Sequence, residues 1–334
     1  MITGWNVNRH LPRLMFIYNP LAGPADVADT VELVADFWQA RGWRVAVRAT
    51  QYAGHAAEMA RAAAADGYRM VLAGGGDGTL GEVANGLVHS ETILAPLPMG
   101  TGNSFGKELN IPRPNLVDHR ALVEASALLA SGRVQRMDVG RQQNGRYWLL
   151  WTGTGADGFL VNEIEPRSKL TKRLGAPGYA LQAFQIVPRF PGMRATVQVD
   201  DQQFDDEYML VTVSNCRKFG GGLLLLSPAA ALDDGLFEVW LVRGHGFLKL
   251  LRMFAEVRRG RHLVDPDIQV VTGRQVTVHT LPPMGVHTDG DPAGVTPFSC
   301  EMVPAALRVL IPPSAPAGLF AQPGLSLPEV LRNN

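Results

Sequence analysis

Cysteine is scarce in this chain of 334 residues. Only Cys216 and Cys300 are present, far apart and without a CxxC pair. Disulfide-held secreted folds and thiolate zinc sites both need more cysteines at closer spacing. The eight histidines show no HxxxH pair either, so a histidine-bound metal is not expected. The low cysteine content instead favours a cytoplasmic protein.

Net charge and long apolar runs are also missing. The 31 basic and 31 acidic side chains cancel, so long-range attraction to phosphate backbones is absent and we expect no nucleic-acid partner. No segment approaches the roughly 18 apolar residues of a membrane-spanning helix. The apolar run at 14–18 is too short for the core of a signal peptide, and we predict that it forms the first strand. We therefore expect no spanning segment.

The first half of the chain has the pattern of an α/β domain. At about 150 residues per domain, the length suggests two domains. Up to residue 132, short apolar runs alternate with helical periodicity, as in βα units that build a parallel sheet. The pattern predicts strands at 14–18, 43–49, 70–73 and 92–97. It predicts two helix faces, formed by Val27, Val31, Val34 and Trp38 and by Leu80, Val83, Ala84 and Leu87. Left-handed helix ends are expected at Gly42, Gly67 and Gly132.

The second half is predicted to be rich in β-sheet. Residues 134–142 and 146–152 flank Asn144-Gly145, which predicts a hairpin with a type I′ turn. Further strands are expected at 194–199, 208–214, 236–242, 268–271, 275–280 and 307–311. One helix is expected at 247–259, with Leu248, Leu251 and Ala255 on one side.

A first glycine-rich loop, residues 74–78, lies between a predicted strand and a predicted helix. It reads Gly-Gly-Gly-Asp-Gly and is followed by Thr79. Consecutive glycines let backbone N–H groups approach phosphate oxygens, and the start of a helix adds a positive dipole. Thr79 and Glu82 also fit a capping box for that helix. The segment 76–81 matches G-x-G-x-x-G, but no acidic residue follows about 20 positions later, so a dinucleotide site is disfavoured.

A second glycine-rich loop, residues 99–103, reads Met-Gly-Thr-Gly-Asn after the next predicted strand. Residues 102–106 also match the G-x-S-x-G of hydrolases, with Ser104 as nucleophile and His262, His279 or His287 as the base. No oxyanion segment precedes it, so phosphate binding is the better interpretation. The two glycine-rich loops and the segment 19–23 are expected at one edge of the sheet, where α/β folds bind ligands.

These segments together resemble the diacylglycerol kinase catalytic domain family, in particular the bacterial lipid kinases related to diacylglycerol and sphingosine kinases. Gly-Gly-Asp-Gly-Thr alone is shared with NAD kinases, whereas the later acidic segments favour the lipid kinases. The matching pieces are residues 19–23, Thr50, 54–56, 75–82, 100–103, 138–140, 219–222, 227–228, 232–235 and 289–291.

The resemblance implies an α/β plus β fold. A Rossmann-like nucleotide domain at 1–132 would be followed by a β-sandwich-like, lipid-substrate domain at 133–303, with 304–334 returning to the first domain. ATP and Mg²⁺ are the implied cofactors. The implied nucleotide-binding residues are Asn19, Pro20, Gly23, Thr50, Gly75, Gly76, Asp77, Gly78, Thr79, Glu82, Gly100, Thr101 and Asn103.

The resemblance also implies the reacting groups. Asp77 would help to place the phosphates, and a structural Mg²⁺ would be held by Asp234 with the backbone carbonyls of Ala231 and Leu236. Relatives carry Asp-Gly-Glu where this chain has 289–291, Asp-Gly-Asp. Asp291 is therefore expected to accept the proton of the lipid hydroxyl, with Asp289 in reserve.

Alternatives stay open at this point. An NAD kinase, or a nucleotide- or lipid-binding regulator without catalysis, would share several of these segments, and Gly81 departs from the asparagine of relatives. The expected partner is a lipid substrate, and a homodimer is left open. Basic clusters suggest peripheral contact with the inner membrane face. They comprise Arg167, Lys169, Lys172 and Arg173, and Arg258, Arg259, Arg261 and His262.

Overall fold

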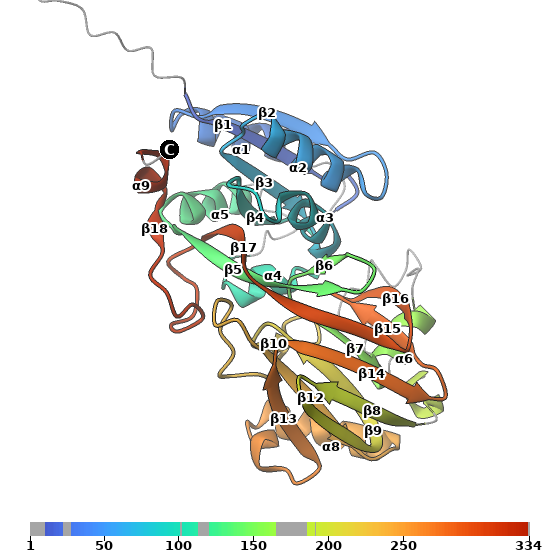
Figure 1. Cartoon of the computed structure of the whole chain (residues 1–334). Helices are drawn as coiled ribbons and strands as arrows, with labels where there is room; N and C mark the ends of the chain where they lie inside the picture. Colours follow the sequence, from blue (N-terminus) through green and yellow to red (C-terminus); the bar gives the residue numbers. More distant parts are fainter. Residues whose placement is uncertain are drawn as a thin grey trace, which may run out of the picture.

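A computed structural model describes residues 11–22, 28–100, 102–112, 120–164, 186–190 and 192–332. Its N-terminal part is built on a parallel sheet with the strand order β2-β1-β3-β4 (Figure 1). All four strands predicted for this part are confirmed to within two residues at each end. They are β1 (Arg13–Tyr18), β2 (Arg44–Ala49), β3 (Met70–Gly75) and β4 (Ile93–Pro98).

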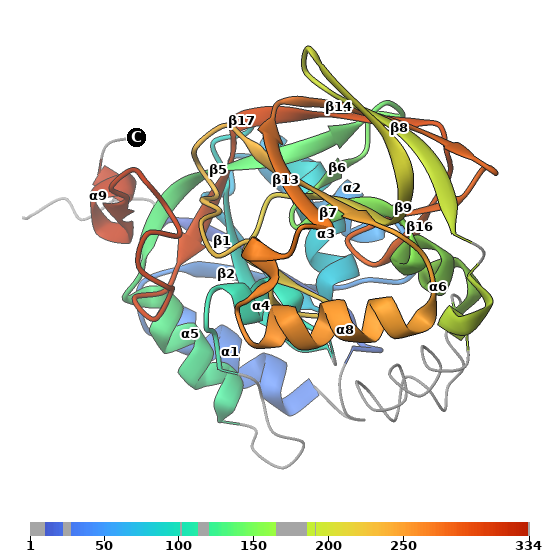
Figure 2. The same ribbon diagram turned by 90° about the horizontal axis from the view of Figure 1, so that it is seen from below.

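Helices cover both faces of this parallel sheet. α1 (Ala28–Gln39) packs beside α5 (Ala121–Ala130), and α2 (His55–Ala65) packs beside α3 (Asp77–Leu87). Figure 2 shows α1 and α5 together on the lower face. The predicted faces are confirmed where described, because the side chains of Val31, Val34 and Trp38 on α1 and Leu80, Val83, Ala84 and Leu87 on α3 are buried. Val27 lies outside the described residues.

Two of the three predicted helix ends are left-handed. Gly42 and Gly67 have φ angles of 82° and 75°, but Gly132 has no positive φ. The prediction for Gly132 was wrong because the chain passes directly from α5 into the next strand. A Cβ at Gly132 would lie 2.2 Å from the carbonyl oxygen of Ile311, so close strand approach requires this glycine.

The C-terminal part is mainly β-sheet, as predicted. Its strands enclose a second apolar core, which includes Trp148, Val211, Phe237 and Val278. The strands are β5 (Arg133–Gln142), β6 (Tyr147–Trp148), β7 (Trp151–Gly155), β8 (Met193–Val199), β9 (Gln202–Ser214), β10 (Lys218–Phe219), β11 (Leu224–Leu225), β12 (Phe237–Arg243), β13 (Ile268–Gly273), β14 (Gln275–Leu281), β15 (Gly285–Thr288), β16 (Asp291–Val295), β17 (Phe298–Ile311) and β18 (Leu325–Ser326). The helical elements are α4 (Ser104–Glu108), α6 (Ala156–Ile164), η1 (Val187–Arg189), α8 (Phe247–Arg258), η2 (His262–Val264) and α9 (Leu327–Arg332). None of the helices in the described ranges is long and apolar enough to cross a membrane.

The hairpin between β5 and β6 has a different turn from the one predicted. Gly145 has a φ of 85°, whereas Asn144 has no positive φ. Gly145 N–H donates to the Gln142 carbonyl at 2.8 Å, and Gln142 N–H donates to the Arg146 carbonyl at 2.9 Å. A type I′ turn needs a positive φ at both central residues, so that prediction was wrong. The hairpin is confirmed for β5 and β6, but the strand predicted at 146–152 is divided, and its second part, β7, pairs with β9 and β15.

The predicted helix at 247–259 is confirmed as α8, and its exposed side is unusual. Leu250, Met253 and Val257 form its buried side, whereas Leu248 and Leu251 are 81% and 44% exposed. The face predicted to share Leu248 and Leu251 therefore points toward solvent.

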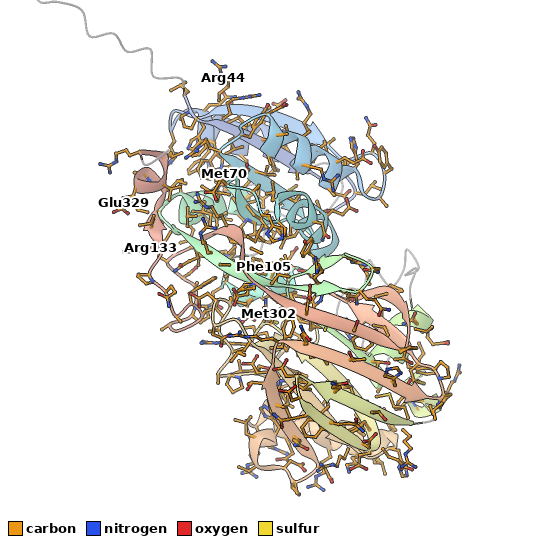
Figure 3. The ribbon with its side chains drawn as sticks, in the orientation of Figure 1. Arg44, Met70, Phe105, Arg133, Met302 and Glu329 are labelled. Atoms are coloured by element: carbon orange, nitrogen blue, oxygen red, sulfur yellow. The ribbon has the colours of Figure 1, made fainter. Side chains whose placement is uncertain are left out.

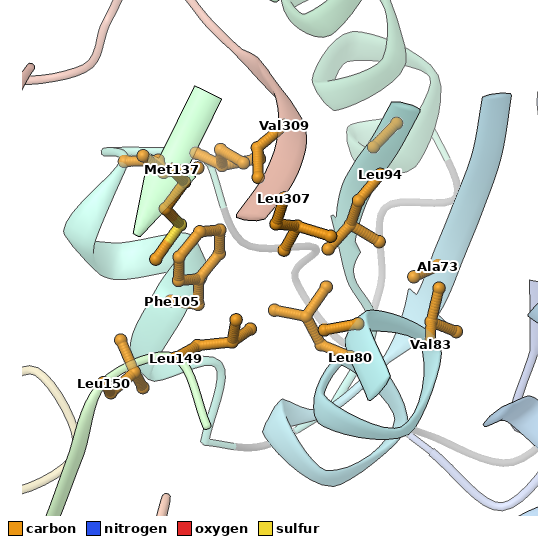
Figure 4. Close-up of a cluster of buried hydrophobic side chains, with 14 of the residues drawn as sticks. Ala73, Leu80, Val83, Leu94, Phe105, Met137, Leu149, Leu150, Leu307 and Val309 are labelled. Atoms are coloured by element: carbon orange, nitrogen blue, oxygen red, sulfur yellow. The ribbon is translucent and has the colours of Figure 1, made fainter. Parts of the chain in front are cut away.

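Strand β17 joins the two parts of the molecule. Cys300 pairs with Val276 of β14, and Val309 pairs in parallel with Leu94 of β4. Phe105, Met137 and Leu307 meet in one apolar core at this junction (Figure 4). The boundaries at 132 and 303 and the return of 304–334 remain predictions, and this shared core shows how closely the two parts pack.

Candidate active site

Three loops lie side by side at the carboxyl edge of the parallel sheet. Asn19 follows β1, Gly76 follows β3 and Met99 follows β4, and these strands are direct neighbours. The chain moves from β1 to β2 on one side, while β3 lies on the other side of β1. Such a change of direction opens a crevice at the strand ends, where open α/β sheets bind ligands.

The two glycine-rich loops touch through their backbones. A Cβ at Gly100 would lie 2.7 Å from the Cα of Gly76. A Cβ at Gly75 would lie 2.5 Å from the Cβ of Thr79. Glycine at these positions is therefore needed for the loops to pack, and the packing brings them together at the start of α3.

Asp77 connects the two glycine-rich loops. It is the first residue of α3, and its carboxylate accepts hydrogen bonds from the N–H groups of Ser104 at 2.8 Å and Phe105 at 3.1 Å. These donors belong to the first turn of α4, where N–H groups have no helical partner. The carboxylate thus fixes the second loop against the first.

Glu82 has a different role from the predicted capping box. α3 begins at Asp77, two residues before Thr79, and has no side-chain cap. The Glu82 carboxylate instead accepts from Gly54 N–H at 2.8 Å and Ala56 N–H at 3.1 Å. It therefore stabilises the start of α2 and the preceding loop, which begins at Thr50, whose N–H donates to the Tyr18 carbonyl at 2.8 Å. The capping-box prediction was wrong because the glycines of the loop let the helix start earlier.

Two asparagines shape the loops locally. Asn19 Oδ1 accepts from Leu21 N–H at 2.9 Å. Asn103, at a φ of 51°, accepts from Gly100 N–H at 3.2 Å and donates back to the Gly100 carbonyl. Pro20 and Gly78 are exposed at the same edge. Gly23 and Thr101 lie outside the described residues.

The two carboxylates of the turn between β15 and β16 have contrasting surroundings. Asp289 accepts from three N–H groups, those of Leu149 and Leu150 at 2.9 Å and Trp151 at 3.2 Å. Burial nevertheless raises the pKa of Asp289 to about 6, because desolvation outweighs these hydrogen bonds. Asp289 thus anchors the segment 149–151.

The Asp291 carboxylate is accessible. Its side chain is 51% exposed, and one oxygen lies 3.0 Å from Nη2 of Arg146. Arg146 was not among the predicted site residues. It lies 145 positions before Asp291. The pairing of β7 with β15 and the hydrogen bonds from residues 149–151 to Asp289 bring the two segments together in the fold.

The predicted metal position has excess negative charge. Asp234 lies beside Asp233, and partial burial together with this neighbour raises the pKa of Asp234. Burial, and then Asp234, raise the pKa of Glu238 to about 8. Asp138 is 2% exposed and accepts from Gly235 and Ala305 N–H, both at 2.6 Å.

This charge fits a hard cation. The described residues hold no group of three or more His, Cys, Asp or Glu side chains arranged for a metal. The predicted Mg²⁺ ligands, however, comprise one carboxylate, that of Asp234, and the backbone carbonyls of Ala231 and Leu236. Oxygen donors completed by water suit Mg²⁺, and crowded carboxylates are stabilised by a nearby cation.

The hydrolase interpretation finds no support in the geometry. Ser104 is 5% exposed, and within the described ranges it makes no hydrogen bond to a histidine. His262 bonds the Leu226 carbonyl at 2.8 Å and His287 bonds Asp157 at 2.8 Å. His279 is exposed on β14. None of these three histidines therefore serves Ser104 as a base.

The second basic cluster is smaller than predicted. Arg258, Arg259 and Arg261 are exposed, but His262 is 1% exposed and packs beside Trp240. His262 was wrongly included, since it belongs to the interior. The first cluster, 167–173, lies outside the described residues.

Comparisons with known proteins agree with this geometry. The diacylglycerol kinase catalytic domain profile matches residues 13–142, and the profile of the YegS C-terminal NAD kinase beta sandwich-like domain matches 152–311. A diacylglycerol kinase of Bacillus subtilis is 28% identical over 90% of this chain and 97% of that protein. One from Staphylococcus saprophyticus is 28% identical over 90% of this chain and 95% of that protein.

The fold has solved counterparts. A crystal structure of a candidate diacylglycerol kinase from Bacillus anthracis superposes with a TM-score of 0.75 at 24% identity, over 91% of this chain and 98% of that chain. The similarity confirms an α/β part followed by a β-sandwich-like part. Residues 13–142 therefore belong to the diacylglycerol kinase catalytic domain family, and residues 152–311 to the YegS C-terminal domain family.

Proposed function

We propose that this protein is an ATP-dependent kinase that transfers the γ-phosphoryl group to a hydroxyl of diacylglycerol or a related lipid. The observation that carries the proposal is the pair of touching glycine-rich loops, joined by Asp77, at the start of α3. Backbone N–H groups at a helix start bind phosphate. The sequence relatives named diacylglycerol kinase support the choice of acceptor.

The nucleotide would lie along the carboxyl edge of the sheet. Gly75, Gly76 and Gly78 would offer N–H groups to its phosphates, and Thr50 and the loop ordered by Glu82 would border it. Phosphoryl transfer depends mainly on positioning and charge neutralisation. The remaining predicted contacts, those of Asn19, Pro20, Gly23, Thr79, Gly100, Thr101 and Asn103, stay proposals of the same kind.

Asp291 is our proposed general base. Its carboxylate is half-exposed, whereas both oxygens of Asp289 already accept backbone hydrogen bonds. As the lipid oxygen bonds to the γ-phosphorus, the bond to the β,γ-bridging oxygen breaks and ADP leaves. The hydroxyl proton passes to Asp291. Arg146 holds the Asp291 carboxylate in position.

Mg²⁺ would be held by Asp234 with the carbonyls of Ala231 and Leu236. Bound there, it would neutralise the carboxylate charge of Asp234 and its neighbour Asp233. Asp77 is proposed to help place the phosphates in the nucleotide site.

The lipid acceptor calls for contact with a membrane surface. We propose peripheral docking of a cytoplasmic protein through α8 and η2, where Leu248, Leu263 and Val264 are 81%, 55% and 85% exposed. The exposed Arg252 and Arg258 belong to α8, and the exposed Arg259 and Arg261 lie between α8 and η2. Apolar insertion flanked by arginines suits an anionic lipid surface.

Incubation with γ-labelled ATP, Mg²⁺ and a panel of hydroxyl-bearing lipids tests the function, with NAD in a parallel reaction. We expect label in a lipid, most strongly in diacylglycerol. Label in NAD alone would support the NAD kinase alternative, and ATP binding without transfer to any acceptor would support a regulator.

A further inference from the structure

A cavity lined by β5, β17 and the C-terminal segment lies away from the glycine-rich loops. Its volume is about 360 Å³, within the usual range of about 300–1,000 Å³ for small-molecule sites. Two of its lining residues, Arg136 and Arg308, pair with Glu91, which precedes β4. The glycine-rich loops follow β3 and β4, so the cavity lies toward the opposite edge of the sheet.

The two arginines face each other. Arg136 of β5 and Arg308 of β17 are directly paired positions of an antiparallel ladder. Like charges at such positions are destabilising. Burial, and then the charges of Arg136 and Arg69, lower the pKa of Arg308. The arrangement therefore has a stability cost that an anionic ligand would offset.

One carboxylate is shared by both arginines. Arg136 Nη2 lies 3.3 Å from Glu91, and Arg308 contacts the other Glu91 oxygen. The Glu91 side chain is 61% exposed, so a ligand can displace it. Two guanidinium groups suit the bidentate geometry and double charge of a phosphate monoester.

The rest of the cavity suits a small organic body. The walls combine the amides of Gln135 and Gln322 with apolar side chains and with the carboxylates of Asp138 and Asp233. The Asp138 oxygens already accept from Gly235 and Ala305 N–H. Asp233 accepts from Ala321 and Gln322 N–H at 2.6 and 2.8 Å, which fixes the C-terminal segment as one wall. In Figure 3, Arg133 marks the start of β5 and Glu329 marks α9 on this side of the molecule. The apolar lining residues are Val134, Ala305, Pro323, Leu325 and Val330.

We propose that this cavity binds a phosphate monoester, a dianionic phosphoryl group on a small organic body. The phosphoryl group would bridge Arg136 and Arg308 in place of Glu91. This cavity lies away from the glycine-rich loops, although Asp138 and Asp233 of its wall neighbour the proposed Mg²⁺ position. Binding there does not depend on the proposed kinase activity. The ligand could be a soluble phosphate or a lipid with a phosphomonoester headgroup, and the test below separates these sources.

Calorimetric titration with glycerol 3-phosphate tests the proposal. We expect the double variant Arg136→Gln/Arg308→Gln to bind at least about tenfold more weakly, since charge-assisted hydrogen bonds are lost. Glu91→Gln should bind severalfold more tightly, because the competing carboxylate is gone. Arg44→Gln, an exposed position on β2, should bind like the wild type.

Other results would overturn the site. Absence of binding by the wild type, or equal affinity in the double variant, would contradict it, and so would an equal loss in Arg44→Gln. If the double variant does not fold, Glu91→Gln still decides, because unchanged affinity there would contradict the proposal. Flotation with phosphatidylcholine vesicles, with and without phosphatidic acid, separates the two sources. If the wild type binds phosphatidic acid vesicles and Arg136→Gln/Arg308→Gln does not, the ligand is a lipid. If the wild type binds glycerol 3-phosphate but not these vesicles, the ligand is a soluble phosphate.

Discussion

At the scale of single residues, two aspartates that lie two positions apart have different roles. Asp289 gives both oxygens to backbone N–H groups, whereas Asp291 is 51% exposed and pairs with Arg146. The first arrangement stabilises a turn, and the second leaves a carboxylate available to a substrate.

Asp291→Asn should lower kcat by about 10²–10⁴-fold, the usual contribution of a positioned general base. Its thermal stability should stay near that of the wild type, because an exposed ion pair contributes little. Asp289→Asn serves as the control, and it should cost about 1–3 kcal/mol of stability by disrupting buried hydrogen bonds. Steady-state kinetics and thermal unfolding of both variants measure these effects, and an active Asp291→Asn would rule out the assignment.

In the absence of Mg²⁺, Glu238 should make the protein less stable as the pH rises. Its pKa is raised from 4.5 to about 8 in the fold, so the folded state binds a proton that the unfolded state releases above about pH 4.5. Stability is then highest below that pH and is lost as pH rises to 8. Asp289, raised from 3.8 to about 6, acts in the same direction at lower pH. Glu238→Gln should gain about 2 kcal/mol at pH 8, as measured by unfolding in urea, and an unchanged pH profile would contradict this account.

At the scale of elements, the helices of the N-terminal part are held together by Asp77 and Glu82, whose hydrogen-bond partners the sequence pattern did not identify. Apolar runs and spacing predicted β1–β4 and the buried faces of α1 and α3. The partner of Glu82 could not be predicted, because Gly54, at the start of α2, lies 28 positions away in the sequence. Gly132 was misassigned for a similar reason, since the close approach of β17 comes from far along the chain.

Glu82→Ala should weaken ATP binding more than catalysis. It removes the acceptor of Gly54 and Ala56 N–H, so the loop before α2 loses its anchor. We expect a loss of about 1–2 kcal/mol in stability, as for a lost helix cap, and a higher KM for ATP with kcat nearly unchanged. Glu32→Ala, exposed on α1, is the matched control. A fall in kcat alone would argue instead for direct contact with the reacting phosphate.

At the scale of the whole molecule, the chain has no net charge but carries a local apolar and basic surface. The predicted basic cluster at 258–262 identified only part of it. Leu248 lies on α8, whose other side is buried. Sequence periodicity alone could not show which side of this helix packs against the protein and which is exposed. Docking at a membrane would therefore depend on this surface and not on overall attraction.

Leu248→Glu/Val264→Glu should reduce binding to anionic vesicles severalfold, because it replaces inserting apolar groups with repelled charges. Leu281→Glu, at a site 74% exposed on β14, should bind like the wild type. Vesicle sedimentation measures both. The double variant should keep its activity toward a short-chain, water-dispersed diacylglycerol, and unchanged vesicle binding would place the docking surface elsewhere.

The most direct test of the account is transfer of γ-phosphate from ATP to diacylglycerol in mixed vesicles, with the product identified by mass spectrometry. We predict phosphatidic acid from the wild-type protein and Mg²⁺, with a rate at least about a hundredfold lower for Asp291→Asn. A wild-type protein that folds, binds ATP and forms no phosphorylated lipid would contradict the central claim.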